Sequence, residues 1–157
     1  MIYVFDTSAF IVLKNFYPST FPTLWGRLDG MVGSETVISV REVFNELHSY
    51  NDADFIQDWA KQHKVMFAKP ENDELLVVQR ILAIPHFQML VGNKAILKGT
   101  PVADPFVVAA AKIKQPATVV TQETLKPNAA KIPNVCQHFD VPCVDLETFM
   151  AQQGWTF

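Results

Sequence analysis

The chain has 157 residues, of which 49% are hydrophobic and 18% are charged, and its formal net charge is −3. This composition excludes a disordered chain, and the mild acidity argues against a protein that coats nucleic acid through bulk charge. Because no apolar stretch approaches the roughly 18 residues of a membrane span and the start lacks a signal-peptide pattern, we expect a cytoplasmic protein with no membrane contact.

Short apolar runs alternate with helical patterns in the first half of the chain. Residues 1–5 form an apolar run that predicts a buried strand, and Asp6 after it can cap a helix. Pro22 predicts the start of a second helix, because proline suits the first helical turn. Ser39 stands three residues before Glu42, a spacing that predicts a capping box. The other predicted elements are a strand at 36–39, helices at 40–49 and 52–64, and a minor strand at 65–67.

The second half continues the alternation. A helix is predicted at 72–84, followed by an alanine- and valine-rich helix at 102–113 that is apolar on most sides and therefore buried. Pro105 is tolerated only in the first turn of that helix, which places Asp104 at or near its N-terminus. Strands are predicted at 117–121 and 141–144, and a last helix at 146–153 is capped by Asp145. Strands separated by helices, without repeats or linkers, predict one α/β domain over residues 1–157 with a parallel sheet covered on both faces.

Four acidic side chains follow the predicted strands or begin helices. Asp6 ends the first strand, Glu46 lies on the helix after the second strand, Asp104 begins the buried helix, and Glu123 follows the strand at 117–121. Ligand sites in parallel sheets lie outside the carboxyl ends of the strands, so we expect these acids to converge. Carboxylates brought together repel one another unless a cation neutralises them. Oxygen ligands suit Mg²⁺ or Mn²⁺, which predicts a metal site.

Each acid also has a structural interpretation. Asp6 and Asp104 can be helix caps, Glu46 a solvated helix residue and Glu123 an ordinary loop acid. Glu42 and Glu46 share one helix face, so their spacing leaves them as equal candidates.

The ordered set of motifs resembles the PIN domain family, and in particular the small single-domain PIN proteins that include VapC-type toxins of type II toxin–antitoxin systems. The resemblance covers nearly the whole chain. It implies a three-layer α/β/α sandwich around a parallel sheet of four or five strands, and it favours Glu46 over Glu42. The motifs, in chain order, are an apolar strand ending in Asp6-Thr7-Ser8, Glu46-Leu47, Ala103-Asp104-Pro105-Phe106 and Val119-Val120-Thr121-Gln122-Glu123.

The resemblance further implies a ribonuclease that depends on Mg²⁺ or Mn²⁺. Carried over position by position, Asp6, Glu46 and Asp104 are the expected metal-site acids, with Glu123 as a fourth acid. Ser8 and Thr121 are expected to support the site by hydrogen bonds. The chain departs from the family at two points, because many members have Asp or Asn at the position of Glu123, and Lys126 stands where a later aspartate often occurs.

The expected partners follow from the same resemblance. They are RNA in single-stranded or loop regions, where the bases are accessible, an antitoxin protein and a second copy of the chain in a homodimer. Lys94, Lys98 and Lys126, together with Lys131, are weaker candidates for contacts to substrate phosphates. Two alternatives stay open: a non-catalytic PIN-like scaffold that binds RNA or a protein partner, and a phosphatase or DNA nuclease that uses the same acids.

Overall fold

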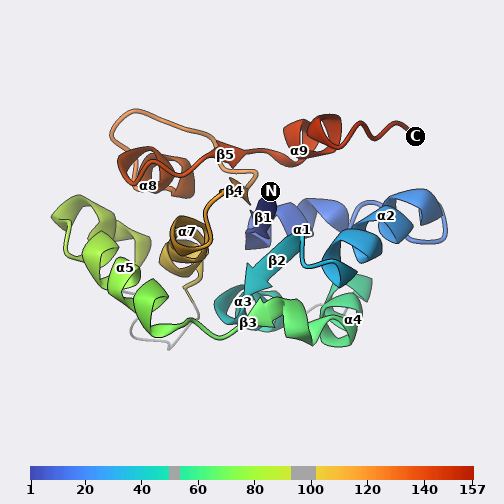
Figure 1. Ribbon diagram of the computed structural model, residues 1–157, viewed down its shortest axis with the longest axis horizontal. Helices are drawn as coiled ribbons and strands as arrows, with labels where there is room; N and C mark the ends of the chain where they lie inside the picture. Colours follow the sequence, from blue (N-terminus) through green and yellow to red (C-terminus); the bar gives the residue numbers. More distant parts are fainter. Residues whose placement is uncertain (50–53, 93–101) are drawn as a thin grey trace.

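The computed structural model describes residues 1–49, 54–92 and 102–157. Its strands form one parallel sheet of five strands in the order β3-β2-β1-β4-β5, which confirms the predicted parallel α/β class (Figure 1). Most strands are short, and β1 is the central one. The strands are β1 (Ile2–Phe5), β2 (Val37–Val40), β3 (Phe67–Ala68), β4 (Ala117–Val120) and β5 (Cys143–Val144).

Helices cover both faces of this sheet. Helices α5, α7 and α8 lie on one side of the strands and α1, α2 and α9 lie on the other, which gives three layers (Figure 1). In the described part of the chain, no helix is long and apolar enough to cross a membrane. The helices are α1 (Thr7–Leu13), α2 (Pro22–Gly33), α3 (Arg41–Ser49), α4 (Phe55–Gln62), α5 (Asn72–Leu82), α7 (Asp104–Ile113), α8 (Ile132–His138) and α9 (Leu146–Gln152), with 3₁₀ turns at Lys64–Met66 and Pro85–Leu90.

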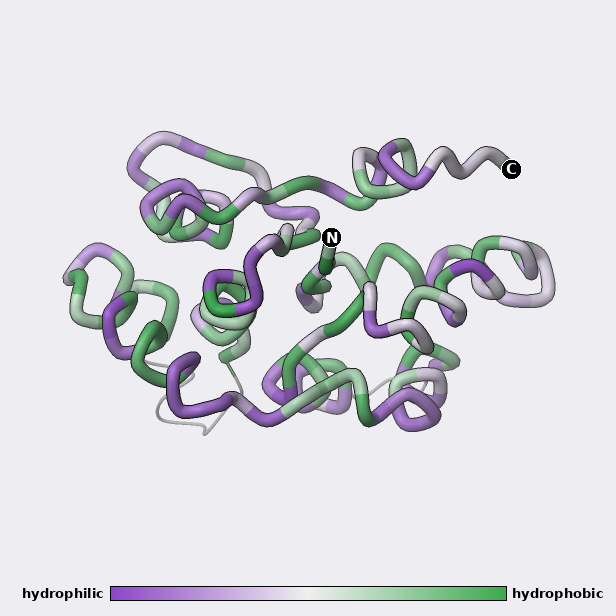
Figure 2. The backbone as a smooth tube through the Cα atoms, in the orientation of Figure 1, coloured by the Kyte–Doolittle hydropathy of each residue, from purple (hydrophilic) through white to green (hydrophobic). Residues whose placement is uncertain are grey.

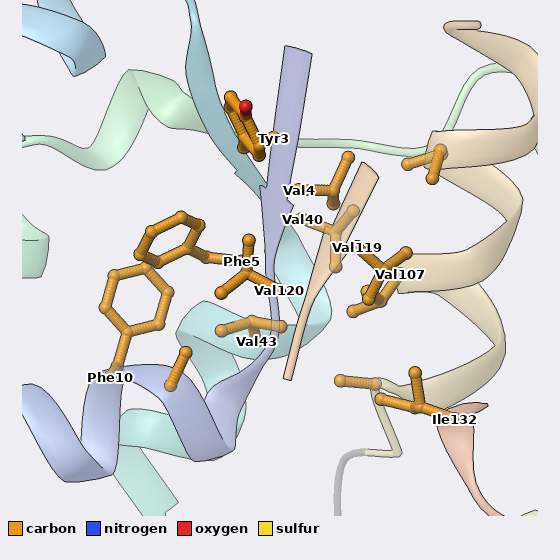
Figure 3. Packing of buried hydrophobic residues seen from close by; sticks show 14 of the residues in the cluster. Tyr3, Val4, Phe5, Phe10, Val40, Val43, Val107, Val119, Val120 and Ile132 are labelled. Carbon is orange, nitrogen blue, oxygen red and sulfur yellow. The ribbon is translucent and has the colours of Figure 1, made fainter. Parts of the chain in front are cut away.

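Alternating side chains of the central strand divide the core into two halves. Val4 lies toward Val107 of α7, whereas Phe5 lies on the opposite face beside Phe10 of α1 (Figure 3). The Phe5 ring is also 5.1 Å from the Phe149 ring of α9, centroid to centroid, in an edge-to-face arrangement. This is the two-residue period of a strand buried on both faces. In Figure 2 the central strands are mostly in the hydrophobic colours, and hydrophilic stretches occur in the peripheral helices.

The start of α3 differs from the sequence prediction. Ser39 lies within β2, opposite Phe67 of β3, and its hydroxyl donates a hydrogen bond of 2.7 Å to the Phe5 carbonyl. Helix α3 begins at Arg41, directly after β2 ends. The predicted capping box of Ser39 and Glu42 is therefore wrong, because the serine hydroxyl joins β2 to β1 instead of capping a helix.

Helix α8 was not predicted at all. Its N-cap residue is Lys131, whose side chain makes no capping hydrogen bond. The N–H of Ile132 is instead satisfied by the Glu123 carboxylate at 2.9 Å. The capping carboxylate lies nine positions earlier in the chain, so the local sequence shows only Pro133, a proline in the first turn that the sequence prediction did not use.

Phe149 is the aromatic anchor of α9 on the sheet, since it is fully buried and its ring packs edge-on against both Tyr3 and Phe5. We expect Phe149→Ala to lower the free energy of unfolding by about 3–5 kcal/mol, because it leaves a cavity in the core. The control is Phe157→Ala, at a ring that is 62% exposed, where the loss should stay below about 1 kcal/mol. Urea unfolding measures both, and equal losses would contradict this account of the core.

Candidate functional site

The strand order of the sheet reverses between β1 and β4, so the carboxyl ends of these two strands form a topological switch point. From β1 the sheet extends to β2 and β3 on one side and to β4 and β5 on the other. In parallel sheets, the crevice at such a switch point is the usual place for a ligand. Phe5 and Val120 are opposite one another in register, so the residues that follow them, Asp6 and Thr121, meet at this crevice.

Asp6 is held rigidly at the switch point. Its side chain is buried, and one carboxylate oxygen accepts a 2.6 Å hydrogen bond from the Thr7 N–H. The other oxygen accepts hydrogen bonds from the hydroxyls of Ser8, at 2.7 Å, and Thr121, at 2.6 Å. Burial raises the pKa of Asp6, and these hydrogen bonds oppose the rise because they favour the charged form. Ser8 and Thr121 thus hold the Asp6 carboxylate by hydrogen bonds.

Glu46 reaches the crevice from α3 and joins three helices. Its carboxylate accepts a hydrogen bond from the Thr7 hydroxyl of α1, at 3.4 Å, and another from the N–H of Ala103 at the start of α7, at 2.9 Å. Burial raises the pKa of Glu46 to about 7, and the negative charges of Asp6 and Glu123 add to the rise.

Glu42, the other candidate on α3, does not take part in this crevice. Its carboxylate is 3.3 Å from the Arg41 guanidinium, and its other oxygen is buried without a hydrogen-bond partner among the described residues. The structure thus brings Glu46, and not Glu42, to Asp6.

Asp104 is the first residue of α7, as Pro105 predicted. Unlike the other three acids, its carboxylate accepts no hydrogen bond from any described residue. Burial raises the pKa of Asp104 to about 8, and the charges of Asp6, Glu123 and Glu46 all push it in the same direction. Asp104 is therefore the acid whose charge is least compensated by the protein.

Glu123 closes the group of acids from the side of α8. Its carboxylate accepts the hydrogen bond from the Ile132 N–H, and its own N–H donates to the Thr121 hydroxyl at 3.2 Å. Burial raises the pKa of Glu123 and the charge of Asp6 raises it further, while the Lys131 ammonium lowers it. Among the described residues, Lys131 is thus a cation that acts on Glu123.

The predicted lysines contribute less to the described site. Lys126 is exposed, and its backbone carbonyl accepts a hydrogen bond from the Asn134 side chain. Lys94 and Lys98 lie outside the described residues. Within the described part of the chain, Lys131 has an electrostatic effect on Glu123.

One known protein family matches nearly the whole chain. Residues 3–157 match the family described as DUF4411, a domain of unknown function. The chain belongs to the DUF4411 family. The matched segment contains all four acids and, apart from Ile2 of β1, every strand of the sheet. No curated protein matches the chain, so the chemistry of this DUF4411 domain is argued from its acids.

The donor set of the DUF4411 site has the chemistry of a hard-cation site, although the ligands are not arranged for one in this conformation. Four carboxylates with raised pKa values offer only oxygen donors, as Mg²⁺ and Mn²⁺ prefer. Within residues 1–49, 54–92 and 102–157, however, no three His, Cys, Asp or Glu side chains are placed to hold a metal ion as they stand. In this conformation both oxygens of Glu46 and one oxygen of Glu123 accept hydrogen bonds.

Sequence analysis overlooked Thr7 at this site. Its N–H binds Asp6 and its hydroxyl binds Glu46, so it connects two of the acids. A hydroxyl residue directly after a strand-exit aspartate is the pattern that indicates such a role. A pocket of about 510 Å³ between β2, the 3₁₀ turn at Lys64–Met66 and α5 has none of the four acids in its lining.

The raised pKa values of Glu46 and Asp104 predict a pH-dependent stability in the absence of metal. The folded protein retains their protons up to about pH 7 and 8, whereas the unfolded chain releases them near the ordinary values of 4.5 and 3.8. Because the folded state then binds more protons, the contribution is fully present below about pH 4 and is lost as the pH rises to about 8.

Urea unfolding at several pH values between 5 and about 9, with a chelator present, measures this slope. Asp104→Asn should flatten it, whereas Asp58→Asn, a matched change on the exposed face of α4, should leave it unchanged. A slope that is the same in all three proteins would contradict the assignment.

Proposed function

We propose that the chain is a metal-dependent ribonuclease that hydrolyses RNA phosphodiester bonds with Mg²⁺ or Mn²⁺ held by Asp6, Glu46 and Asp104. The observation that carries the proposal is the convergence of four carboxylates at the switch point, where the charges of Asp6, Glu123 and Glu46 all raise the pKa of Asp104. The resemblance of the ordered motifs to PIN domains supports the same reading.

The energetics of the acids favour a cationic ligand. Burial raises the pKa of each of the four, and the charge of Asp6 further raises the pKa values of Glu46, Asp104 and Glu123. Carboxylates whose pKa values are raised by burial and by mutual repulsion, and which lie in a crevice, are candidates for function. A divalent cation would offset this repulsion, whereas a purely structural cluster would retain it.

Each residue has a distinct role in this proposal. Asp6, fixed by Ser8 and Thr121, would set the position of the cation, and Asp104 would offer the carboxylate that has no other partner. Glu46 would exchange the Ala103 N–H for the cation, and Glu123 would act from the rim. The chemistry that Mg²⁺ or Mn²⁺ supplies at such a site is a lowered pKa of water and neutralisation of phosphate charge. The hydrolysis needs no covalent intermediate between the RNA and the protein.

RNA as the substrate, an antitoxin as a partner and a homodimer as the assembly are the parts of the proposal that rest on the PIN resemblance. Single-stranded or looped RNA is the favoured substrate, because unpaired bases and backbone are accessible there. DNA and phosphomonoesters, tested in parallel, distinguish a ribonuclease from a DNA nuclease or phosphatase at the same acids.

Cleavage of a mixed pool of single-stranded and structured RNA tests the proposal. Purified protein should cleave with Mn²⁺ or Mg²⁺ and not with chelator. Residues that only orient metal ligands contribute about 10–100-fold, so the loss of a ligand in Asp104→Asn should lower the rate by at least about 100-fold. Asp58→Asn is the matched control and should cleave like the unaltered protein. Cleavage that survives chelator, or that survives Asp104→Asn, would overturn the proposal.

A second candidate is a non-catalytic scaffold that binds RNA or a protein. It is favoured by the fact that Glu46 and Glu123 already serve as hydrogen-bond acceptors at the starts of α7 and α8. These hydrogen bonds give Glu46 and Glu123 a structural role that does not require a metal.

Calorimetric titration with Mn²⁺ separates the two candidates. We expect Mn²⁺ to bind at millimolar concentration or below, and we expect this heat to disappear in Asp104→Asn while folding is retained. Absence of Mn²⁺ binding by folded, unaltered protein would favour the scaffold.

A further inference from the structure

Gln122 lines a pocket whose walls include none of the four acids. This pocket has a volume of about 410 Å³ and lies between α1 and α9, and we call it the α1/α9 pocket. Its walls are apolar and half-buried, with Val12 and Phe16 from the α1 side and Met150 and Trp155 from the α9 side. Its volume falls within the range of small-molecule sites, roughly 300–1,000 Å³.

Gln122 connects the α1/α9 pocket to the candidate site. It stands between Thr121 and Glu123 in sequence, lines the pocket, and donates its backbone N–H to the Ser8 hydroxyl at 2.9 Å. Ser8 also binds Asp6, and Val12 lies one helical turn beyond Ser8 on the same face of α1. The pocket therefore begins about one turn of helix from Ser8, the residue that hydrogen-bonds to the buried aspartate.

The aromatic side chains of the pocket are placed for stacking. Trp155 is braced edge-on by Phe149 with ring centroids 5.5 Å apart, and Phe16 is braced by Phe21 at 5.2 Å. Braced rings that are only half-buried keep surface available for another flat group. Proteins that bind single-stranded nucleic acid use aromatic rings in this way.

A cation lies at the outer end of the same aromatic row. The Phe157 ring is 6.2 Å from the Trp155 ring, and the exposed Arg27 guanidinium lies 5.3 Å from the centre of the Phe157 ring. A guanidinium next to aromatic rings suits a nucleotide, because the base can stack while the phosphate meets the positive charge.

Two polar groups line the otherwise apolar pocket. The side-chain oxygen of Gln122 accepts a hydrogen bond from the Leu146 N–H at 2.7 Å, which leaves its amide NH₂ free of any partner among the described residues. Glu147 is exposed and offers a carboxylate acceptor. The edge of a nucleobase carries both acceptors and donors, so it matches this pair.

From these contacts we propose that the α1/α9 pocket binds one unpaired nucleobase of the RNA, adjacent to the phosphate that the acids would cleave. The proposal rests on the proposed ribonuclease function. Apolar grooves between helices also accept amphipathic helices of protein partners. The aromatic row that ends in a guanidinium, the free Gln122 amide and the continuity with Ser8 and Asp6 favour the nucleobase.

The test measures binding apart from cleavage. Asp104→Asn protein is titrated with a fluorescein-labelled single-stranded RNA pentanucleotide, and anisotropy gives the Kd. Adding Trp155→Ala should weaken binding by about 5-fold to 150-fold, which corresponds to the loss of one stacked base. Trp155→Phe keeps a ring and should restore affinity to within about 3-fold of the Asp104→Asn parent. Tyr17→Ala, at an exposed aromatic outside the pocket, is the matched control and should bind like the parent.

A second variant guards against misfolding. Ala151 is exposed and lines the pocket, so Ala151→Trp fills the space without removing a core contact, and it should weaken binding like Trp155→Ala. Unlabelled RNA should also quench tryptophan fluorescence in the Asp104→Asn protein and not after Trp155→Phe, because Trp25 and Trp59 are buried.

The outcomes separate this proposal from the proposed function. RNA affinity that is unchanged in both Trp155→Ala and Ala151→Trp, while the unaltered protein cleaves RNA with metal, would overturn the pocket and leave the ribonuclease standing. Loss of affinity in both variants, from a protein that cleaves nothing, would support the pocket on a non-catalytic scaffold. Binding of an amphipathic helical peptide, with no binding of RNA, would overturn the nucleobase in favour of a protein partner.

Discussion

The hydrogen bond from the Thr121 hydroxyl to the Asp6 carboxylate is the contact on which the candidate site depends. It spans 115 residues of sequence and fixes the carboxyl ends of the two central strands relative to each other. A buried carboxylate is costly without such donors, and the same hydroxyl also accepts the N–H of Glu123. The positions of the first and the last acid therefore depend on a single threonine side chain.

The acids have two opposing effects on the fold. Asp6, Glu46 and Glu123 accept backbone N–H groups at the starts of α1, α7 and α8, where a negative charge is favourable. They also repel one another and Asp104 across a buried crevice. The protein thus gains helix caps and bears electrostatic repulsion with the same side chains. A cation would remove the repulsion, but it would compete with the caps for the carboxylate oxygens of Glu46 and Glu123.

The parts of this arrangement that local sequence determines were predictable. Asp6 follows an apolar strand, and Pro105 restricts Asp104 to the first turn of α7, so both positions followed from neighbouring residues. The choice between Glu42 and Glu46 did not, because both lie on one face of α3 and the deciding contacts come from Thr7 and Ala103. The same limit applies to Ser39, whose partner is a carbonyl on β1, and to the cap of α8, which is the Glu123 carboxylate, although Pro133 marks the first turn of that helix locally. Groups that are distant in sequence decided each of these points.

The position of β1 at the centre of the sheet has a consequence for how the chain is made. β1 precedes the other four strands of the sheet in the chain and is therefore made before them, yet its partner β4 begins only at Ala117. Until β4 is available, one edge of an apolar strand stays unpaired, and such edges promote association between chains. Pairing over so long a separation is also slow compared with local contacts. Fragments that end before β4 should therefore aggregate, and the complete chain must close its central strand late.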